Sequence, residues 1–451
     1  MAKVLHFPVR EAYRRLELNP AQTIVLGFAL TVFIGVVLLS LPFSTADGKG
    51  APLLTALFTA TSATCVTGLV VVDTADYYSL FGELVVLLLI QVGGLGYMTS
   101  ATLFSILVGK RIGLRERIIL MEAYNLDTLG GVVRLTRNIV LMALAFEGIG
   151  VVLLSLRWIP EFGVWRGLYY SLFHAVSAFN NAGFDLMGNF RSFTQYVVDP
   201  YVNLVVSALI IAGGLGFIVL INLPRFPRVN LHAKVVLTTS AALIGVGTLS
   251  IFLLEGKNPL TLGKLPPAGK LLAAFFQSVT PRTAGFSTLD IAHFREPTLL
   301  LLSVLMFIGA SPGGTGGGIK TTTFAVLLAA IWTMIRGRQD VEIYNRRVPS
   351  VVIYKALTIA LVAVALVVTM TILLATLERS KVVPALFEVT SAFGTVGLTT
   401  GITPRLTAAG KVLLIVTMFL GRVGLLTFTL AFMRRQAPMR YRYPEERVLV
   451  G

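Results

Sequence analysis

Four short segments of the sequence contain a glycine among small, hydroxyl-bearing and amide residues, and they are the first candidates for chemistry. We call residues 64–69, 179–184, 281–286 and 393–398 glycine segments 1 to 4. Glycine allows backbone angles that turn successive carbonyl oxygens the same way. A ring of such oxygens can replace the water shell of a dehydrated cation. The candidate cation-binding residues are Val66, Thr67, Gly68, Asn181, Ala182, Gly183, Thr283, Ala284, Gly285, Thr395, Val396 and Gly397.

The glycine segments recur at a nearly constant period. Successive segment glycines are 115, 102 and 112 residues apart. Ten residues before each of them stands a phenylalanine, and six before stands a serine, except in segment 3, which has Val279. Such self-similarity predicts four copies of one supersecondary unit.

Segment 4 reads Thr395-Val396-Gly397, which is the core of the potassium-channel filter sequence, and the other three segments are degenerate versions of it. Only one glycine remains in each segment, so we expect fewer ordered ion sites than in a potassium channel. Such glycines can also serve only to end re-entrant helices or to allow close helix packing. Their recurrence in register favours the cation site.

A glycine-rich stretch at 309–318 interrupts an apolar segment and is followed by Lys320. It resembles a phosphate-binding loop only superficially, because no strand precedes it. A lost helical backbone and a lysine inside a membrane both need a reason, so a gate is favoured over a simple kink. The predicted gate residues are Gly309, Gly313, Gly314, Gly316, Gly317, Gly318, Lys320 and Arg422.

Arg422 lies near the middle of the last apolar segment, where a charge is expensive and usually faces a cavity or a partner. It aligns with Gly94 and Gly214 of the other repeats. We therefore expect it on the pore side, as an electrostatic barrier that contacts the glycine-rich stretch. Glu147 is either its partner or a packing residue.

Composition places the chain in the membrane class. Of 451 residues, 55% are apolar and 13% are charged, whereas soluble domains have about 25% charged residues. The single cysteine, Cys65, excludes an intramolecular disulfide, and four scattered histidines give no sign of zinc. The apolar segments contain no paired acids and no nucleophile–base pair, so we expect neither an enzyme nor a bound cofactor.

The hydropathy pattern predicts an all-α integral membrane protein. Eight apolar segments are long enough to span a bilayer; they cover residues 22–41, 80–108, 139–156, 201–223, 235–254, 298–335, 356–377 and 412–433. Shorter apolar stretches at 53–63, 168–178, 271–279 and 385–392 precede the glycine segments. The predicted fold is four tandem helix–pore-helix–filter–helix repeats, with eight spanning helices around one pseudo-fourfold pore. The repeats are 21–110, 131–224, 233–336 and 352–434, between termini 1–20 and 435–451.

The net charge of +16 follows topology and does not indicate nucleic-acid binding. Five segments (1–20, 109–138, 224–234, 335–355 and 434–451) hold 23 of the 38 Lys and Arg residues. They alternate with the connections on the opposite face, so the positive-inside rule makes them and both termini cytoplasmic. Acids after the segments would raise the cation concentration at the outer mouth or lie in solvated loops: Asp73, Asp76, Asp185 and Asp290.

The glycine segments, the glycine-rich break and Arg422 together resemble the superfamily of potassium transporters that includes Trk, Ktr and HKT, over about residues 22–433. Eight spanning segments without an additional N-terminal pair look more like the Ktr membrane subunits of the KtrB group than like TrkH. The resemblance implies potassium selectivity, since sodium-selective members have serine where Gly68 stands. It also implies a bacterial cell-membrane homodimer, a KtrA-like cytosolic ring of nucleotide-binding regulatory subunits, and stimulation by sodium.

Two other classes of function compete with a potassium pore. A sodium-coupled secondary transporter usually has inverted repeats and ionisable residues at the midplane, whereas these repeats are parallel and end in glycine segments. A sodium-selective or ammonium-conducting pore also remains open, because the sequence does not distinguish passive from sodium-coupled passage.

Overall fold

The computed structural model describes residues 19–96, 99–103, 112–123, 131–225, 229–432 and 446. Nearly all of the predicted terminal segments 1–20 and 435–451 lie outside the described residues. The described chain is mostly helical, and its one sheet is a hairpin of β1 (Glu342–Ile343) and β2 (Arg346–Arg347).

The helices fall into groups that recur along the chain. The long helices are α2 (Pro20–Leu39), α8 (Val132–Phe162), α12 (Leu231–Glu255) and α16 (Ser350–Glu378). The helices before the glycine segments are α3 (Leu53–Thr64), α9 (Val164–Phe179), α13 (Pro267–Val279) and α17 (Val382–Gly394). The helices after them are α5 (Leu80–Leu95), α10 (Pro200–Leu215), α14 (Glu296–Phe307) and α18 (Ala408–Val423). The others are α4 (Thr74–Tyr77), α7 (Leu114–Ala123), α11 (Phe217–Asn222), α15 (Thr321–Ile335) and α19 (Leu425–Phe432). Short 3₁₀ turns lie at Pro42–Ser44, Thr194–Tyr196, Leu223–Arg225, Ile291–His293 and Thr403–Arg405.

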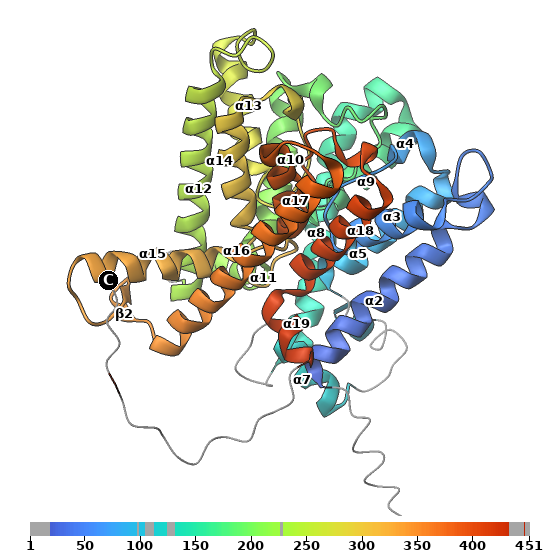
Figure 1. Ribbon diagram of the computed structural model, residues 1–451. Coiled ribbons are helices and arrows are strands. Elements are labelled where there is room, and N and C mark those ends of the chain that lie inside the picture. Colours follow the sequence, from blue (N-terminus) through green and yellow to red (C-terminus); the bar gives the residue numbers. More distant parts are fainter. Residues whose placement is uncertain are drawn as a thin grey trace, which may run out of the picture.

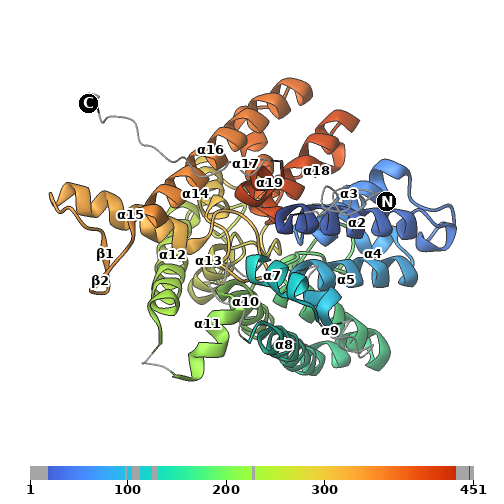
Figure 2. The same cartoon turned by 90° about the horizontal axis from the view of Figure 1, so that it is seen from below.

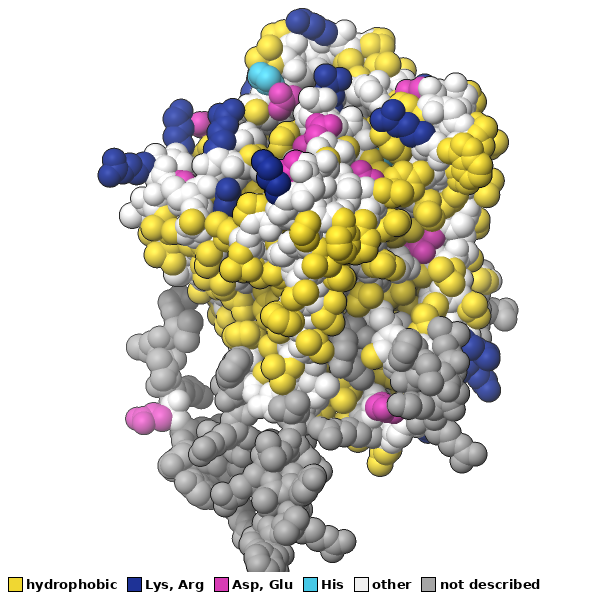
Figure 3. All heavy atoms as spheres, turned by 90° about the vertical axis from the view of Figure 1, so that its right-hand side faces the viewer, with side chains coloured by type: hydrophobic (Ala, Val, Ile, Leu, Met, Phe, Trp, Pro, Cys, Tyr) yellow, Lys and Arg dark blue, Asp and Glu magenta, His cyan; other side chains and the backbone are white. Residues whose placement is uncertain are grey.

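The long helices have membrane dimensions. Among the described residues, α2, α8, α12 and α16 are the four helices that are long and apolar enough to cross a bilayer. A broad belt of apolar side chains covers the face shown in Figure 3, with charged side chains gathered above it. Exposed apolar surface of this extent indicates contact with lipid.

The sequence predicts continuous apolar helices over 80–108, 201–223 and 412–433, but in the structure each of them is broken at a glycine. Helices α5, α10 and α18 end at Gly96, Gly216 and Gly424, whose φ angles are +85°, +90° and +87°. These left-handed angles favour glycine and break the helix. At Gly216 the chain also passes against the glycine-rich stretch, because the Phe217 N–H donates to the Gly313 carbonyl at 2.9 Å.

Three of the helices that precede a glycine segment pack between a long helix and the helix that follows the segment, whereas α13 packs against α12 and α10. Helix α3 contacts α2 and α5, α9 contacts α8 and α10, and α17 contacts α16 and α18. Seen from below, these groups are arranged about a common centre (Figure 2). The approach is close because a Cβ at Gly93, Gly213 or Gly421 would lie nearer than 3.0 Å to the last carbonyl of the short helix. Small residues allow this packing between membrane helices.

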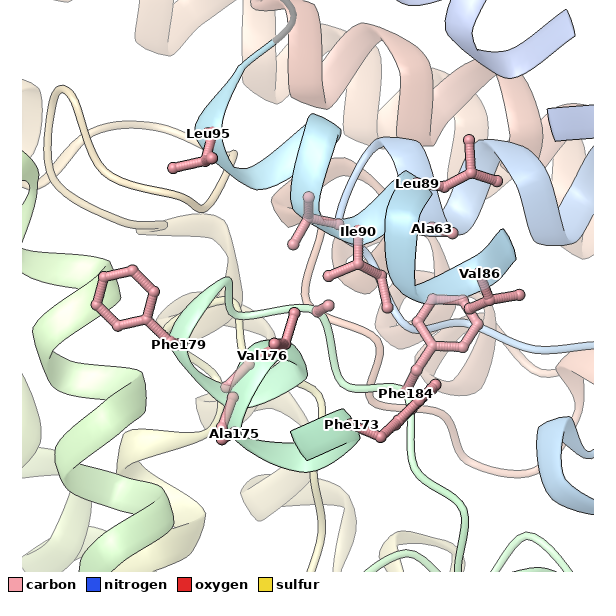
Figure 4. Close-up of a cluster of buried hydrophobic side chains, with 14 of the residues drawn as sticks. Ala63, Val86, Leu89, Ile90, Leu95, Phe173, Ala175, Val176, Phe179 and Phe184 are labelled. Atoms are coloured by element: carbon pink, nitrogen blue, oxygen red, sulfur yellow. The ribbon is translucent and has the colours of Figure 1, made fainter. Parts of the chain in front are cut away.

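The apolar core runs between the repeats. Figure 4 shows part of one buried cluster, which includes Phe173, Val176 and Phe179 of α9 and Val86 and Ile90 of α5. Of the phenylalanines that recur ten residues before each glycine, Phe58, Phe173 and Phe387 are fully buried and Phe275 is partly buried.

One part of the chain lies apart from this bundle. Helix α15 and the β1–β2 hairpin project sideways from it (Figures 1 and 2). The hairpin turn uses Tyr344 and Asn345, which have positive φ angles of 51° and 58°. Side chains at this end are exposed, including Trp332 and Arg347.

Candidate cation site and the loop beneath it

The four glycine segments share one backbone conformation. In each of them the glycine and the residue two positions before it have positive φ angles. The angles of the earlier residues are 57° at Val66, 58° at Asn181, 71° at Thr283 and 50° at Thr395. Three of these residues are β-branched, for which the left-handed region is a genuine outlier. Strain of this kind is retained where surrounding structure enforces it, and it clusters at functional sites.

The ends of the short helices enforce this conformation. The Val66 N–H donates to the Ala63 carbonyl at 3.1 Å and the Thr67 N–H to the Ser62 carbonyl at 2.8 Å. Segments 2 and 4 repeat both bonds. This is the Schellman arrangement, in which a left-handed residue ends a helix and satisfies its last carbonyls. Segment 3 differs, because the Ala284 N–H donates to the Thr280 carbonyl at 2.9 Å.

The recurring serines hold the segments from behind. The Oγ atoms of Ser62 and Ser391 accept from the Gly68 and Gly397 N–H groups, each at 3.1 Å. Ser177 instead donates to the Phe184 carbonyl at 2.7 Å. In segment 3, Thr280 makes the equivalent bond to the Phe286 carbonyl at 2.6 Å. The sequence showed the serines without their role, and it concealed Thr280 because this residue is one position out of register.

The four segments meet in cyclic order. A Cβ added to Gly68 would lie closer than 3.0 Å to the Ala182 carbonyl oxygen of segment 2. The same relation holds from Gly183 to Ala284, from Gly285 to Val396 and from Gly397 to Thr67. Each glycine thus faces the carbonyl that precedes the next glycine, and the order closes from segment 4 to segment 1. All twelve candidate cation-binding residues lie in this ring of segments.

The glycine-rich stretch lies directly against the ring. Residues between α14 and α15 are not helical, and we call 309–318 the glycine-rich loop. Its Gly317 N–H donates to Thr395 Oγ1 at 2.9 Å, and Thr315 Oγ1 donates to Asn181 Oδ1 at 3.0 Å. The Ser311 N–H donates to the Gly214 carbonyl at 2.9 Å. The loop is therefore attached to segments 2 and 4 and to the end of α10.

Two cationic side chains bind the loop through backbone carbonyls. The Arg422 guanidinium donates to the carbonyls of Thr315 and Gly93, and to that of Gly94 at 3.4 Å. Lys320 Nζ donates to the Gly316 carbonyl at 2.7 Å. No ion pair with an acid involves either side chain within the described part of the chain. Arg422 thus links the loop to the end of α5.

A cavity of about 810 Å³ lies on the side of the ring where the loop is found. Glycines at the broken helix ends, Gly96 and Gly424, line it together with Gly314, Lys320 and Arg422. The predicted gate residues are Gly309, Gly313, Gly314, Gly316, Gly317, Gly318, Lys320 and Arg422, and all of them lie in the loop, beside it or at this cavity.

Glu147 is not the partner of Arg422. Its carboxylate accepts from Asn180 Nδ2 at 2.9 Å and from Gln91 Nε2 at 3.2 Å. The Gln91 side chain in turn accepts from Asn180 Nδ2 at 2.9 Å. This buried network ties segment 2 to α5 and α8, so Glu147 supports the back of the ring.

The acids after the segments differ in their surroundings. Asp73 accepts from the Phe190 N–H at 2.5 Å and Asp76 from the Asn189 N–H at 3.0 Å, so both fix the loop after segment 2. Asp290 is exposed and pairs with His293 at 2.9 Å. Burial raises the pKa of Asp185, in the same loop, to about 7, and the negative charge of Asp73 adds to this rise.

Comparison with known proteins adds independent evidence. The family profile described as "TrkH: Cation transport protein" matches residues 11–224 and 228–440. The chain belongs to the TrkH family of cation transport proteins. Members of this family are transporters and not enzymes, as the absence of a catalytic constellation in the sequence predicted.

Comparison with individual relatives shows which members of the family this chain resembles. The chain is 45% identical to Ktr system potassium uptake protein B of Bacillus subtilis (strain 168), over 96% of this chain and 97% of that protein. It is 42% identical to potassium/sodium uptake protein NtpJ of Enterococcus hirae, over 97% and 98% of the two chains. The solved structure of TrkH from Vibrio parahaemolyticus superposes with a TM-score of 0.69 at 18% identity, over 90% of this chain and 84% of that one. The predicted membership of the Trk/Ktr superfamily, on the KtrB side, is confirmed.

Proposed function

We propose that this chain takes up potassium across the bacterial cell membrane through the ring of glycine segments. The single observation that carries the proposal is the cyclic order of four segments with the same left-handed backbone positions. Carbonyl oxygens brought together in this way can replace the hydration shell of a cation. The names of relatives over nearly the full length, potassium uptake proteins of Ktr systems, favour potassium as that cation.

The ring is the selectivity filter of a pore built from four repeats, 21–110, 131–224, 233–336 and 352–434. In this arrangement each repeat contributes two crossings, eight in all, and the second crossing is broken at a glycine. The glycine-rich loop and Arg422 form the gate; the bond of the loop to segment 4 and the position of Arg422 in the lining of the cavity of about 810 Å³ support this role. Irregular backbone at this depth is tolerable because it is buried or lines a cavity.

Partners follow from the family and from the names of relatives. Relatives named as parts of a Ktr system support a regulatory partner, proposed here as a KtrA-like cytosolic ring acting on a homodimer. The termini and the basic segments face the cytoplasm in this proposal. The relative named for potassium and sodium uptake supports sodium as an activator, and it keeps sodium as the alternative transported ion.

The test is potassium rescue of a bacterium that lacks its own potassium uptake systems. Wild type is compared with Gly68→Ser, with and without a co-expressed regulatory subunit. The serine Cβ would lie against the Ala182 carbonyl oxygen at a φ of +86°, so growth at low potassium should fall. Gly48→Ser is the matched control, because Gly48 also has a positive φ, of +70°, but an added Cβ there meets no atom within 4 Å.

Rescue by wild type and by Gly48→Ser, weakened in Gly68→Ser, would support potassium uptake through this ring. Lack of rescue by the wild-type protein despite confirmed membrane insertion would count against potassium. Sodium uptake measured in the same cells would then decide for the alternative ion.

A further inference from the structure

Arg282 is the cation of glycine segment 3, and no acid among the described residues forms an ion pair with it. The side chain is 6% exposed. Its Nη2 lies 3.4 Å from Ser240 Oγ, whereas Nε and Nη1 are buried without a hydrogen-bond partner among the described residues. A buried cation without a partner is strongly unfavourable. A group outside the chain that balances this charge would stabilise the folded state.

Comparison with repeat 2 shows which polar partners Arg282 lacks in repeat 3. Asn180 occupies the place in segment 2 that Arg282 has in segment 3, three residues before the glycine. The Asn180 Nδ2 donates to Glu147 of α8 and to Gln91 of α5, each at 2.9 Å. In the register of the repeats, Ile244 of α12 and Ile211 of α10 stand at these two positions. Repeat 3 therefore has a charge where repeat 2 has an amide, and apolar side chains where repeat 2 has polar partners.

Packing supports this register. A Cβ at Gly150 of α8 would meet Ala175 of α9 and Leu209 of α10. A Cβ at Gly247 of α12 would likewise meet Ser278 of α13 and Leu305 of α14. Glu147 and Ile244 each lie three residues before these glycines, so they are equivalent in space as well as in sequence.

The missing polar partners leave a groove between α10, α12 and α13, which we call the α12 groove. Its volume is about 780 Å³, and its walls are almost wholly apolar; they include Ile211, Leu215, Ser240, Ile244, Leu271 and Phe275. Along α12 the groove extends from Leu237 to Phe252. Fifteen residues of α-helix correspond to about 22 Å. Ser240, the residue that contacts Arg282, lies in the half of the groove nearer the start of α12.

A second cation lies at the same end. Lys234 precedes Leu237 and Ala241 by three and seven residues, so the three side chains share one face of α12. Lys234 also lies 5.9 Å from the Tyr344 ring of the hairpin. The α12 groove is thus lined by apolar side chains, and two cations, Lys234 and Arg282, lie beside the end of it that is nearer the start of α12. Basic sites of this kind between membrane helices, near the cytoplasmic side, suit the head groups of anionic lipids.

We propose that the α12 groove binds an anionic phospholipid of the cytoplasmic leaflet, with one acyl chain along α12 and the negative head group between Lys234 and Ser240, where it balances Arg282. The proposal rests on the proposed function in one respect: the orientation given there decides that the lipid comes from the cytoplasmic leaflet. The occupant is a lipid because the groove is apolar and open on the lipid-facing side of a spanning helix, where Leu249 and Leu271 are 60% and 57% exposed. The head group is anionic because both nearby side chains are cationic.

The test is native mass spectrometry of the delipidated, purified full chain, titrated with dioleoylphosphatidylglycerol or dioleoylphosphatidylcholine. Wild type should bind one phosphatidylglycerol per chain roughly thirtyfold more tightly than phosphatidylcholine, the difference expected for two basic residues near an anionic head group. Gly245→Phe should abolish this binding, because a Cβ at Gly245 points into open groove and meets no atom within 4 Å. The matched control is Gly148→Phe on α8, where an added Cβ also meets nothing and which corresponds to Gly245 in the repeat.

A second pair of variants tests the charge. Arg282→Lys should keep the preference for phosphatidylglycerol, and Arg282→Met should reduce it to roughly fivefold, the preference expected from Lys234 alone. Equal binding of both lipids by wild type, or unchanged binding by Gly245→Phe, would overturn the proposal. A disulfide between two copies of the Gly245→Cys variant would also overturn the proposal, because the groove would then be a contact between subunits. If the wild-type protein binds the lipid as expected but shows no potassium uptake, the result would count against the proposed function and not against the lipid site.

Discussion

Left-handed φ angles at Val66, Thr283 and Thr395 are the most specific residue-level feature of this protein. β-Branched residues avoid this region, at a cost of about 1 to 3 kcal/mol each. The Schellman bonds at the ends of the short helices and the bonds from Ser62 and Ser391 oppose relaxation. Carbonyl oxygens held in such a ring can replace the hydration shell of a cation.

In the proposed pore, Asp185 should make uptake sensitive to external pH. Its pKa is raised to about 7, so the carboxyl is neutral below this pH and charged above it. Uptake at low potassium should therefore fall by about fivefold as the external pH drops from 8 to 6, since one unit charge at close range is worth about 1 kcal/mol in water. Asp185→Asn should be low and flat over this range, measured as initial rates of rubidium uptake.

Asp290→Asn is the control for this prediction, because Asp290 is exposed and its contact is with His293. It should keep the wild-type pH profile. A wild-type profile in Asp185→Asn would remove the outer-mouth role assigned to this carboxyl.

The glycine-rich loop is the element that distinguishes repeat 3 from the others. It is held by backbone hydrogen bonds and by Arg422, which donates to Thr315 in the loop and to Gly93 in α5. Bonds to a charged group are worth about 1.5 to 3 kcal/mol. A loop held in this way can shift when a modest free energy is supplied.

Removal of the Arg422 side chain should loosen this loop. In proteoliposomes without a regulatory subunit, Arg422→Met should raise the maximal rate of rubidium influx by about tenfold, as the loss of one charged hydrogen bond would. Arg422→Lys should lie between the two, because an ammonium cannot bridge two carbonyls as a planar guanidinium does. A lower rate in Arg422→Met, at equal reconstituted protein, would contradict a gate held by this residue.

The sequence predicted the short helices before the glycine segments but not the breaks in the helices that follow them. The helices α3, α9, α13 and α17 lie within a few residues of the predicted short stretches, because apolar runs bounded by glycine are local signals. The breaks at Gly96, Gly216 and Gly424 were missed, because these glycines lie in long apolar runs. At Gly216 the break coincides with a contact far away in sequence, the bond from the Phe217 N–H to the Gly313 carbonyl.

The same limit applies to the candidate site. The repeat located the twelve ring residues and the loop, since both recur or interrupt a regular pattern. It did not reveal that Glu147 bonds to Asn180 and Gln91, which lie 33 and 56 residues away. Side-chain partners across repeats are set by three-dimensional packing and leave no periodic trace.

The whole molecule has a proposed orientation that single cysteines can test. Lys49 lies in an exposed loop after α2, and Asn345 lies in the exposed turn of the hairpin. A membrane-impermeant maleimide should label Lys49→Cys in intact cells and Asn345→Cys only after permeabilisation. The native Cys65 is fully buried and should not react in either case. Labelling of Asn345→Cys in intact cells would show that the topology is the reverse of the proposed one, with the basic segments outside the cell.

The central claim is that the four glycine segments bind the transported ion, and bound rubidium tests it most directly. Crystals of the protein in rubidium should show an anomalous peak within the ring formed by the carbonyls of Thr67, Ala182, Ala284 and Val396. In Gly68→Ser this peak should weaken. Strong rubidium sites elsewhere in the protein with none at this ring would contradict the account.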